Sequence, residues 1–238
     1  LMNQRICTLI PAAGSGNRMG DPHTKKTYLS LLDLPVLSQT IRVFDLNPII
    51  SDILVIVSEG DLSNCQAVAI TPYNFSKVLN LVVGGSTRQE SVYNGLNFVP
   101  EDTQLVIVHD GVRPFVTDKM IHECVSSANK FGAAAVAVPT KDTIKVIDEN
   151  QFSVETPNRD QLWAVQTPQC FSKDLLVKAH HQAKVNQVEV TDDAALVEQL
   201  GFKVKLVMGS YNNLKITTPE DIVVARAFAH LSNTAESI

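Results

Sequence analysis

The feature that most constrains this chain is a series of short, continuous apolar runs separated by segments with helical spacing. Such runs are typical of strands that are buried on both faces of a sheet. Five of them come before residue 140, at 6–10, 53–57, 81–83, 105–108 and 133–138. Strands that alternate with helices form a parallel sheet covered by helices on both faces. The sequence therefore predicts an α/β fold, a Rossmann-like, doubly wound and mostly parallel sheet.

Residues with capping side chains mark the ends of the predicted helices. Ser86 or Thr87 is expected to cap a helix over 88–97, because either hydroxyl can accept a backbone N–H. Thr117 is expected to cap the next helix, which Gly132 ends. The other expected elements are a helix that ends before Asn47, helices at 173–184 and after Thr191, a strand at 203–208 and a final helix that Thr218 caps.

Residues 140–160 interrupt this alternation. Segments 143–147 and 152–155 alternate polar and apolar residues around the turn-like segment 148–151, which predicts a β-hairpin. An isolated two-stranded hairpin is rarely stable in water. We therefore expect residues 1–238 to form a single domain whose β-arm protrudes and packs against a second copy of the chain.

Charge and hydropathy exclude several classes of protein. The chain has 20 Lys and Arg against 25 Asp and Glu, a net charge of −5, whereas nucleic-acid-binding proteins normally carry a basic surplus. Polymeric nucleic acid is therefore not expected as a partner, although small phosphorylated molecules need only local positive charge. No apolar run approaches the ~20 residues of a membrane helix, and the first residues have no apolar signal core. We expect a cytoplasmic protein with no membrane partner.

The cysteines and histidines form no metal-binding pattern. The four cysteines are too widely spaced for a zinc motif or a Cys-x-x-Cys pair, so buried, reduced thiols are expected. His180 and His181 lie in a polar helical stretch, and we interpret both as solvated side chains rather than metal ligands.

A glycine-rich loop follows the first predicted strand. Residues 11–20 read Pro-Ala-Ala-Gly-Ser-Gly-Asn-Arg-Met-Gly, with small side chains and backbone N–H groups ahead of Arg18. The loop lacks the Gly-Lys-Ser/Thr ending of a Walker loop, and its glycines do not match the dinucleotide fingerprint. Together with Lys25 and Lys26, it suits a polyphosphate bound against the backbone. An ordinary strand-to-helix turn with solvated bases is the alternative.

Two further polar clusters follow predicted strands. Gly84-Gly85 comes after the third strand, and His109-Asp110 comes after the fourth. Because ligands bind beyond the carboxyl ends of parallel strands, these clusters predict one binding crevice. Turn capping by Asp110 and a structural salt bridge by Arg113 remain alternatives.

Eight short motifs run in order along nearly the whole chain. They are Pro-Ala-Ala-Gly-Ser-Gly-Asn-Arg-Met at 11–19, Lys-Thr-Tyr-Leu at 26–29, Gly-Gly-Ser-Thr-Arg-Gln-Glu-Ser-Val at 84–92, His-Asp-Gly-Val-Arg-Pro at 109–114, Asp-Thr at 142–143 with Asn-Arg-Asp-Gln-Leu-Trp at 158–163, Thr-Pro-Gln at 167–169, Thr-Asp at 191–192 and Lys-Ile-Thr-Thr-Pro-Glu-Asp at 215–221. This set resembles the sugar-phosphate nucleotidyltransferases, and specifically the 2-C-methyl-D-erythritol 4-phosphate cytidylyltransferase family. Thr27 departs from the glutamine of that family.

The resemblance implies a reaction. A cytidylyl group would pass from CTP to 2-C-methyl-D-erythritol 4-phosphate, with release of pyrophosphate, in non-mevalonate isoprenoid biosynthesis. The attacking phosphate oxygen is already ionised near neutral pH, so the step needs no general base. It needs in-line positioning and neutralisation of the charge at the α-phosphate. The resemblance also implies Mg²⁺ or another divalent cation as cofactor.

The resemblance also implies roles for particular residues. Catalytic roles fall to Arg18 and Lys26 at the α-phosphate, and to Arg159 and Lys215 at the sugar-alcohol phosphate. The implied nucleotide-binding residues are Pro11, Ala12, Ala13, Gly14, Gly84, Gly85, Arg88 and Ser91. The implied substrate-binding residues are Asp110, Arg113, Thr143, Thr167 and Thr191, with Asp110 also the candidate metal ligand. The family's spacing to Tyr-Leu favours Lys26 over Lys25.

A homodimer with shared sites is the further implication. The arm would carry Thr143 and Arg159 into the partner's site, and the implied cations would gather around one crevice. These six cations are Arg18, Lys26, Arg88, Arg113, Arg159 and Lys215.

Two alternative functions stay open. Ribitol- and ribulose-phosphate cytidylyltransferases share elements that resemble residues 109–115 and 215–219, although segment 11–14 and Leu162-Trp163 favour methylerythritol phosphate. A nucleotide-binding regulator that kept the fold without the catalysis is the other. Against it, all four positions expected to act in catalysis hold Arg or Lys.

Overall fold

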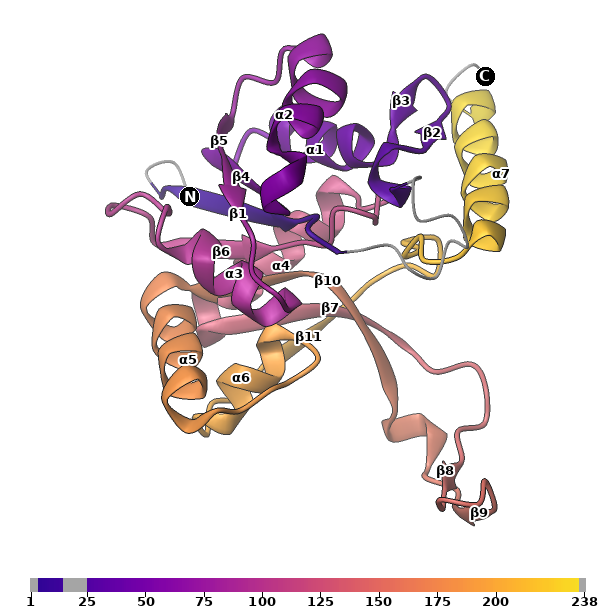
Figure 1. Cartoon of the computed structure of the whole chain (residues 1–238). Coiled ribbons are helices and arrows are strands. Elements are labelled where there is room, and N and C mark those ends of the chain that lie inside the picture. Colours follow the sequence, from indigo (N-terminus) through magenta and orange to yellow (C-terminus); the bar gives the residue numbers. More distant parts are fainter. Residues whose placement is uncertain (1–3, 15–24, 236–238) are drawn as a thin grey trace.

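The protein is described by a computed structural model that covers residues 4–14 and 25–235. Its centre is a seven-stranded sheet with the strand order β11-β7-β10-β6-β1-β4-β5. The strands of this sheet are β1 (Ile6–Pro11), β4 (Asp52–Val57), β5 (Val78–Val83), β6 (Leu105–Val108), β7 (Ala133–Pro139), β10 (Trp163–Ser172) and β11 (Lys205–Met208). The predicted doubly wound, mostly parallel α/β fold is confirmed (Figure 1).

β1 lies inside the sheet and pairs in parallel with β4 and β6. Its Leu9 lies opposite Leu54 on one side and Val108 on the other. All four residues of β6 and all six of β4 are buried, which is why these strands read as continuous apolar runs. The five strands predicted before residue 140 are all present.

The strand β10 was not predicted from the sequence. It is antiparallel to both neighbours, β6 and β7, and its register against β7 shifts between Val165 and Gln169. The polar residues Gln166 and Thr167 and the ring of Pro168 interrupt the apolar pattern there. Those polar residues are buried because they bond to other buried groups, so a hydropathy pattern alone does not reveal the strand.

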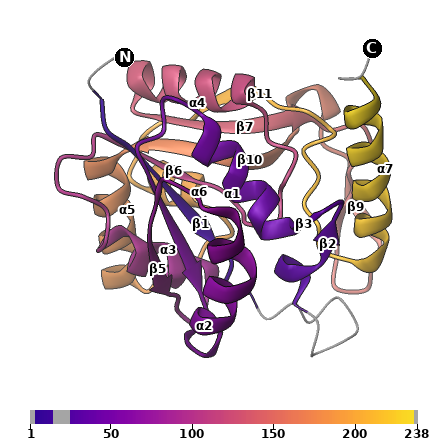
Figure 2. The same ribbon diagram turned by 90° about the horizontal axis from the view of Figure 1, so that it is seen from above.

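Helices cover both faces of the sheet (Figures 1 and 2). The helices α1 (Val36–Leu46), α2 (Leu62–Cys65) and α4 (Asp118–Phe131) pack on one face, and α3 (Arg88–Leu96), α5 (Lys173–Asn186) and α6 (Asp193–Gln199) on the other. Short helical turns lie at Lys26–Tyr28, Glu59–Asp61, Gln66–Ile70, Thr71–Tyr73 and Arg159–Gln161.

Each helix buries an apolar stripe against the sheet. In α1, Leu37, Ile41 and Phe44 recur at helical spacing and are fully buried. Each such side chain contributes about 1.5–3 kcal/mol through its burial. Leu176 and Ala179 of α5 pack in the same way on the opposite face.

The helix caps are mostly those expected. Thr87 accepts the N–H of Glu90 at the start of α3, and Thr117 accepts that of Met120 at the start of α4. Asp192 is the cap of α6, because its carboxylate accepts the N–H of Ala195.

A smaller apolar cluster lies at one edge of the molecule. There α7 (Pro219–Ala235) packs beside the short strands β2 (Ser30–Leu31) and β3 (Leu34–Pro35) (Figure 2). Ile216, just before α7, is fully buried in this cluster and donates its N–H to Val112 O at 2.9 Å. This bond fixes the neighbouring Lys215 beside the loop after β6.

The predicted hairpin is present and protrudes from the body (Figure 1). It holds β8 (Val146–Ile147) and β9 (Ser153–Glu155), which pair in antiparallel fashion. Apolar side chains on this arm are exposed: Phe152 by 71% and Val154 by 62%. Within the described residues no helix is both long and apolar enough to cross a membrane. The four cysteines are buried and unbridged, as expected.

Candidate active site

A pocket of about 400 Å³ lies beyond the carboxyl ends of β1, β5 and β6. The predicted crevice at this edge is therefore present. Its lining residues are Pro11, Ala12, Ala13, Gly14, Lys26, Thr27, Gly85, Ser86, Thr87, Arg88, Ser91, Asp110, Val112 and Lys215.

The first wall is the start of the loop after β1. Ala12 donates its N–H to Ile56 O at 2.7 Å, and Pro11 O accepts the N–H of Gly111 at 3.2 Å. These bonds extend the sheet by one residue, and the small residues that follow, Ala12, Ala13 and Gly14, line the pocket. Arg18, implied as a catalytic residue, lies outside the described residues.

The second wall is the Gly84-Gly85 turn. A Cβ on Gly84 would lie 2.8 Å from both Ala13 Cβ and Ser91 Oγ, so only glycine allows the two loops to approach this closely. Ser91 Oγ accepts the N–H of Gly85 at 3.0 Å and donates to Thr87 O at 2.8 Å. Ser91 therefore lines the pocket and also holds the turn that forms it.

Glu90 holds the same turn from outside. Its carboxylate accepts both the N–H and the hydroxyl of Ser86 at 2.7 Å. These two hydrogen bonds lower the pKa of Glu90 below its ordinary value. The turn is thus fixed from both sides, with the hydroxyls of Ser86 and Thr87 at the rim of the pocket.

Asp110 is the centre of charge in the pocket. Its Oδ2 lies 2.9 Å from Lys215 Nζ and 3.2 Å from Arg113 Nε, and its Oδ1 lies 3.3 Å from Arg88 Nε. Burial alone would raise the pKa of this carboxyl, but the cations, Arg88 first, outweigh it and hold the pKa far below its usual range. Asp110 is therefore ionised and shared by three cations.

Behind Asp110, a chain of hydrogen bonds fixes its backbone. Asp110 N–H donates to Thr167 Oγ1 at 3.0 Å, and Thr167 Oγ1 lies 3.1 Å from His109 Nδ1. His109 Nε2 lies 3.1 Å from Arg113 O, which can only accept. Nε2 therefore carries the hydrogen, and Thr167 donates to Nδ1. Burial lowers the pKa of His109 to about 4, so the ring is neutral at pH 7.

Arg88 connects Asp110 to a second buried carboxylate. Its Nη1 lies 2.7 Å from Asp193 Oδ2, and Asp193 Oδ1 lies 2.9 Å from His180 Nε2. Both partners of this last bond are only 1% exposed. The expectation that His180 is solvated is therefore wrong. The helix α5 is polar on average, but it turns His180 toward the sheet face and leaves His181 exposed.

The two neighbouring lysines have different surroundings. Lys25 Nζ lies 3.0 Å from Asp61 Oδ2, and the hydroxyl of Tyr28 donates to the same oxygen at 2.6 Å. Lys26 instead lines the pocket. The choice of Lys26 as the pocket lysine agrees with this placement.

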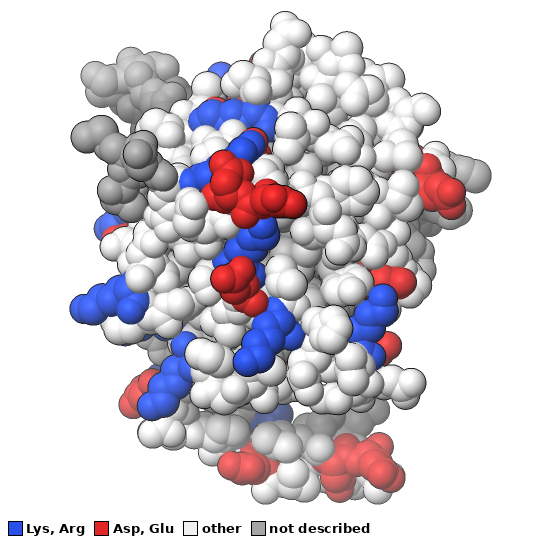
Figure 3. Space-filling view, turned by 90° about the vertical axis from the view of Figure 1, so that its left-hand side faces the viewer, with Lys and Arg blue, Asp and Glu red and all other residues white. Residues whose placement is uncertain are grey.

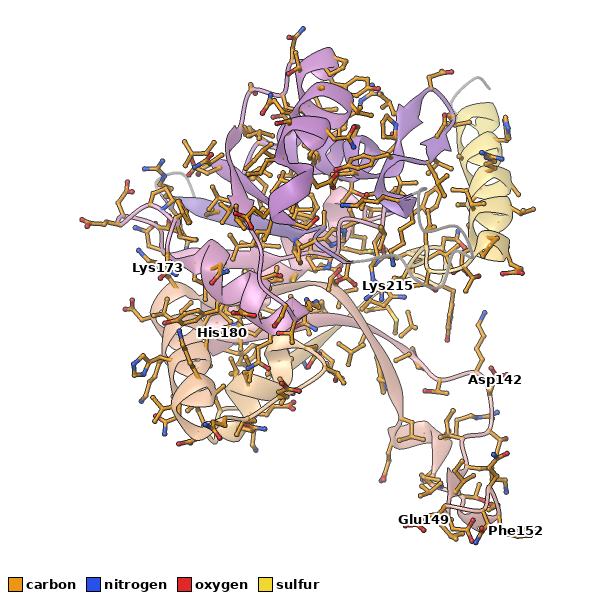
Figure 4. All side chains as sticks on the ribbon, viewed as in Figure 1. Asp142, Glu149, Phe152, Lys173, His180 and Lys215 are labelled. Atoms are coloured by element: carbon orange, nitrogen blue, oxygen red, sulfur yellow. The ribbon has the colours of Figure 1, made fainter. Side chains whose placement is uncertain are left out.

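Six of the implied site residues that the structure describes do not line the pocket. Two of them, Gly84 and Arg113, lie directly beside it, since Gly84 precedes Gly85 and Arg113 contacts Asp110. Thr143 and Arg159 belong to the arm, where Arg159 Nη1 donates to Lys141 O at 3.0 Å. Figure 4 shows Asp142, beside Thr143, on the arm, whereas Lys215 lies in the body of the chain. Thr191 is exposed, and Thr167 lies behind Asp110 rather than in the pocket wall.

Positive charge gathers locally in the pocket. Among its lining residues three are cations (Lys26, Arg88 and Lys215), and one is an acid (Asp110). On the face shown in Figure 3, acids and bases are instead interspersed. The described residues contain no cluster of three or more His, Cys, Asp or Glu side chains able to hold a metal ion. Asp110 is thus the pocket's sole described carboxylate.

The arrangement agrees with what comparisons with known proteins show. Residues 6–230 match the family model of 2-C-methyl-D-erythritol 4-phosphate cytidylyltransferase. The chain belongs to this family. It is 49% identical to the 2-C-methyl-D-erythritol 4-phosphate cytidylyltransferase of Desulforamulus reducens, over 96% of this chain and 97% of that protein. It is 48% identical to that of Caldanaerobacter subterraneus, over 94% and 98%.

Solved structures of family members share the fold. The 4-diphosphocytidyl-2C-methyl-D-erythritol synthase of Anaerococcus prevotii superposes with a TM-score of 0.83 at 32% identity, over 95% of this chain and 99% of that one. The 2-C-methyl-D-erythritol 4-phosphate cytidylyltransferase of Thermus thermophilus gives 0.78 at 33% identity, over 95% and 100%.

Several pocket residues were not singled out from the sequence. The residues Thr27, Ser86, Thr87 and Val112 line the pocket, and each lies within one of the eight recognised motifs. The signal for them was adjacency, since each belongs to a motif that also holds a residue implied in the site. Asp193 gave no such signal, because nothing in a single sequence pairs it with Arg88.

Proposed function

We propose that this protein transfers a cytidylyl group from CTP to 2-C-methyl-D-erythritol 4-phosphate, giving 4-diphosphocytidyl-2-C-methyl-D-erythritol and pyrophosphate. The observation that carries the proposal is the pocket in which two glycine turns meet Lys26, Arg88 and Lys215 around Asp110. Membership of the family and high identity to its members support the same reaction.

The pocket meets the physical demands of this reaction. The attacking phosphate oxygen is an anion, so the residues need not remove a proton from it. What they supply is a fixed geometry and positive charge where negative charge builds up in the transition state. The backbone of 11–14 and the Gly84-Gly85 turn would hold the nucleotide, with Lys26 and Arg18 at the α-phosphate.

Lys215 and Arg113 would bind the sugar-alcohol phosphate beside Asp110. Asp110 holds both cations within 3.2 Å, so their charged ends stay in place before substrate arrives. Such preorganisation removes the need to reorder the cations during the reaction. Thr167 acts one step further back, because it fixes the backbone of Asp110.

The residues present fit a Mg²⁺ ion that is bound mainly by the substrate. Mg²⁺ in phosphate chemistry usually takes one or two protein carboxylates, with phosphates and water completing its shell. The buried, ionised carboxylate of Asp110 is the one ligand of this kind that the described pocket offers. Bound there, Mg²⁺ would neutralise charge on the phosphates of CTP.

The arm supports a homodimer with shared sites. Its exposed apolar side chains, including Ile147 and Phe152, lack cover within the described part of the chain. Thr143 and Arg159 lie on this arm and do not line the described pocket of their own chain. In a dimer each arm would bring these two residues to the pocket of the partner.

Pyrophosphate release tests the proposed reaction. The purified protein is incubated with CTP, Mg²⁺ and one of three phosphates: 2-C-methyl-D-erythritol 4-phosphate, ribitol 5-phosphate or ribulose 5-phosphate. We expect pyrophosphate and a CDP-alcohol with the first, and none after removal of Mg²⁺ by EDTA. Faster turnover of ribitol or ribulose phosphate would overturn the substrate. Binding of CTP with no pyrophosphate from any of the three would indicate a regulator instead.

A further inference from the structure

The buried His180 lies outside the pocket, yet it is linked to the pocket by charged groups. From the pocket outward the order is Asp110, Arg88, Asp193 and His180, and successive polar atoms are 3.3, 2.7 and 2.9 Å apart. Asp110 and Arg88 line the pocket, and Asp193 and His180 do not. The series joins the loop after β6 to α3, α6 and α5 in turn.

Asp193 has two partners, one for each of its oxygens. Burial would raise the pKa of this carboxyl, but Arg88 and the hydrogen bond from His180 together outweigh the burial and keep the pKa below its ordinary value. An ionised carboxylate only accepts hydrogen bonds, so His180 Nε2 carries a hydrogen and donates it to Oδ1. Arg88 Nη1 donates to Oδ2. The two hydrogen bonds together therefore fix the orientation of the Asp193 carboxylate.

The imidazole of His180 makes its hydrogen bond to Asp193. Its Nδ1 is buried and has no hydrogen-bond partner among the described residues. A buried imidazole with one unpartnered nitrogen is less favourable than an apolar side chain of similar size. If the position served packing alone, leucine would fill it better, as Leu176 does one turn earlier in the same helix. The hydrogen bond to Asp193 is what the imidazole adds.

Arg88 needs such support because its guanidinium stands between two carboxylates. Its side chain is 27% exposed and lines the pocket, so without the hold of Asp193 it can turn toward solvent. A misplaced guanidinium would meet the bound nucleotide poorly, because arginine binds phosphate and carboxylate groups through a fixed planar fork.

We propose that His180 is a positioning residue for nucleotide binding: it fixes the carboxylate of Asp193, and Asp193 fixes the guanidinium of Arg88 in the pocket. His180 touches neither substrate nor reacting atoms. The inference rests on the proposed use of CTP, since it concerns how the nucleotide is held.

The test compares substitutions that differ in where they place a donor. In His180→Gln the amide nitrogen lies near the position of Nε2, whereas in His180→Asn it lies near that of Nδ1. His180→Leu keeps the volume and removes both nitrogens. We expect His180→Leu and His180→Asn to raise KM for CTP about tenfold, the usual effect of losing a hydrogen bond to a charged group, with kcat changed less than about twofold. His180→Gln should restore a KM close to that of the wild type.

His181→Leu is the matched control. His181 is the next residue on α5 and is exposed, so its substitution should leave KM for CTP unchanged. A purely structural role for His180 would lower the unfolding temperature of the variants and leave KM alone. The proposal is overturned if folded His180→Leu binds CTP like the wild type, or if His180→Gln and His180→Asn behave alike. The Gln and Asn pair decides the matter even where the Leu variant fails to fold.

A binding measurement separates this inference from the proposed reaction. Titration of CTP into each variant by calorimetry reports nucleotide affinity without turnover. If the wild type binds CTP but releases no pyrophosphate with any phosphate acceptor, the proposed reaction fails, and the affinity series still tests His180. If the wild type is active and the three His180 variants share its affinity for CTP, the positioning role alone fails.

Discussion

Asp110 brings three cations together in a place where they would otherwise repel one another. Lys215 and Arg113 share its Oδ2, and Arg88 contacts its Oδ1. The side chain of Asp110 is 9% exposed, so these interactions are weakly screened by water. Loss of this one charge therefore disturbs every cation at that side of the pocket.

Asp110→Asn should reduce activity strongly. The amide keeps the size of the side chain but lacks the charge that holds Lys215 and Arg88 in place. We expect kcat to fall about 100-fold or more, as when an electrostatic stabiliser is removed from an active site. Pyrophosphate release under saturating substrates measures it. Asp102→Asn is the control, because Asp102 is 68% exposed and pairs only with Arg5 among the described residues. An Asp110→Asn enzyme with near-normal kcat would contradict the assigned role.

The neutral, buried His109 makes stability depend on pH. Burial lowers its pKa to about 4 in the folded protein, whereas an unfolded histidine titrates near 6.5. Between these values the unfolded chain binds more protons, so stability is lost as pH falls. We expect the free energy of unfolding to drop by about 2 kcal/mol between pH 7 and pH 5 from this residue.

Urea unfolding at several pH values measures this loss, and His109→Gln is the comparison. The variant should be less stable at pH 7 but should lose less stability than the wild type on acidification to pH 5. If both proteins lost the same unfolding free energy between pH 7 and pH 5, His109 would not be the group responsible.

Strand ends, rather than whole strands or helices, build the pocket. The turns after β1 and β5 are in contact because Gly84 has no side chain to separate Ala13 from Ser91. The loop after β6 brings Asp110 to the same edge. The sheet therefore places three loops that lie far apart in the sequence around one ligand.

Gly84→Ala should weaken nucleotide binding. The added methyl group would lie 2.8 Å from Ala13 Cβ and from Ser91 Oγ, so the two turns must move apart. We expect KM for CTP to rise about tenfold, since small displacements of binding groups reduce binding markedly. Gly60→Ala is the matched control, because nothing lies within 4 Å of the added methyl group there. Steady-state kinetics of the two variants would contradict the account if their KM values agreed.

The sequence predicts elements well where burial is uniform and poorly where polar groups are buried. The strands at 53–57 and 105–108 are apolar throughout, so their pattern is unambiguous. β10 carries Gln166, Thr167 and Gln169 inside the sheet, and their partners come from distant segments. A pattern along one chain cannot show such partners.

The same limit applies to the site. The glycine turns, Lys26, Asp110 and Lys215 stand at strand ends or in recognised motifs, and they do line the pocket. His180 was interpreted as solvated because its helix is polar. Its hydrogen-bond partner in the interior is Asp193, which belongs to another helix and is recognised only from the fold. The roles of the pocket residues in catalysis stay predictions until variants are assayed.

At the scale of the whole molecule, the arm is the feature that the body does not explain. It projects from the sheet between β7 and β10 (Figure 1). Its apolar side chains Ile147, Phe152 and Val154 are exposed. Among the described residues, Arg159 and Thr143 lie on it, apart from the pocket. A second copy of the chain would both cover the arm and place these residues where they can act.

Mixed dimers test this central claim most directly. Lys26→Ala disables the pocket of a chain, and Arg159→Ala disables its arm; each variant alone should be inactive. Co-expressed in equal amounts, they should pair at random, and one site in each mixed dimer would combine an intact pocket with an intact arm. The account predicts recovery of about a quarter of the wild-type activity per chain. A mixture as inactive as either variant alone would contradict it.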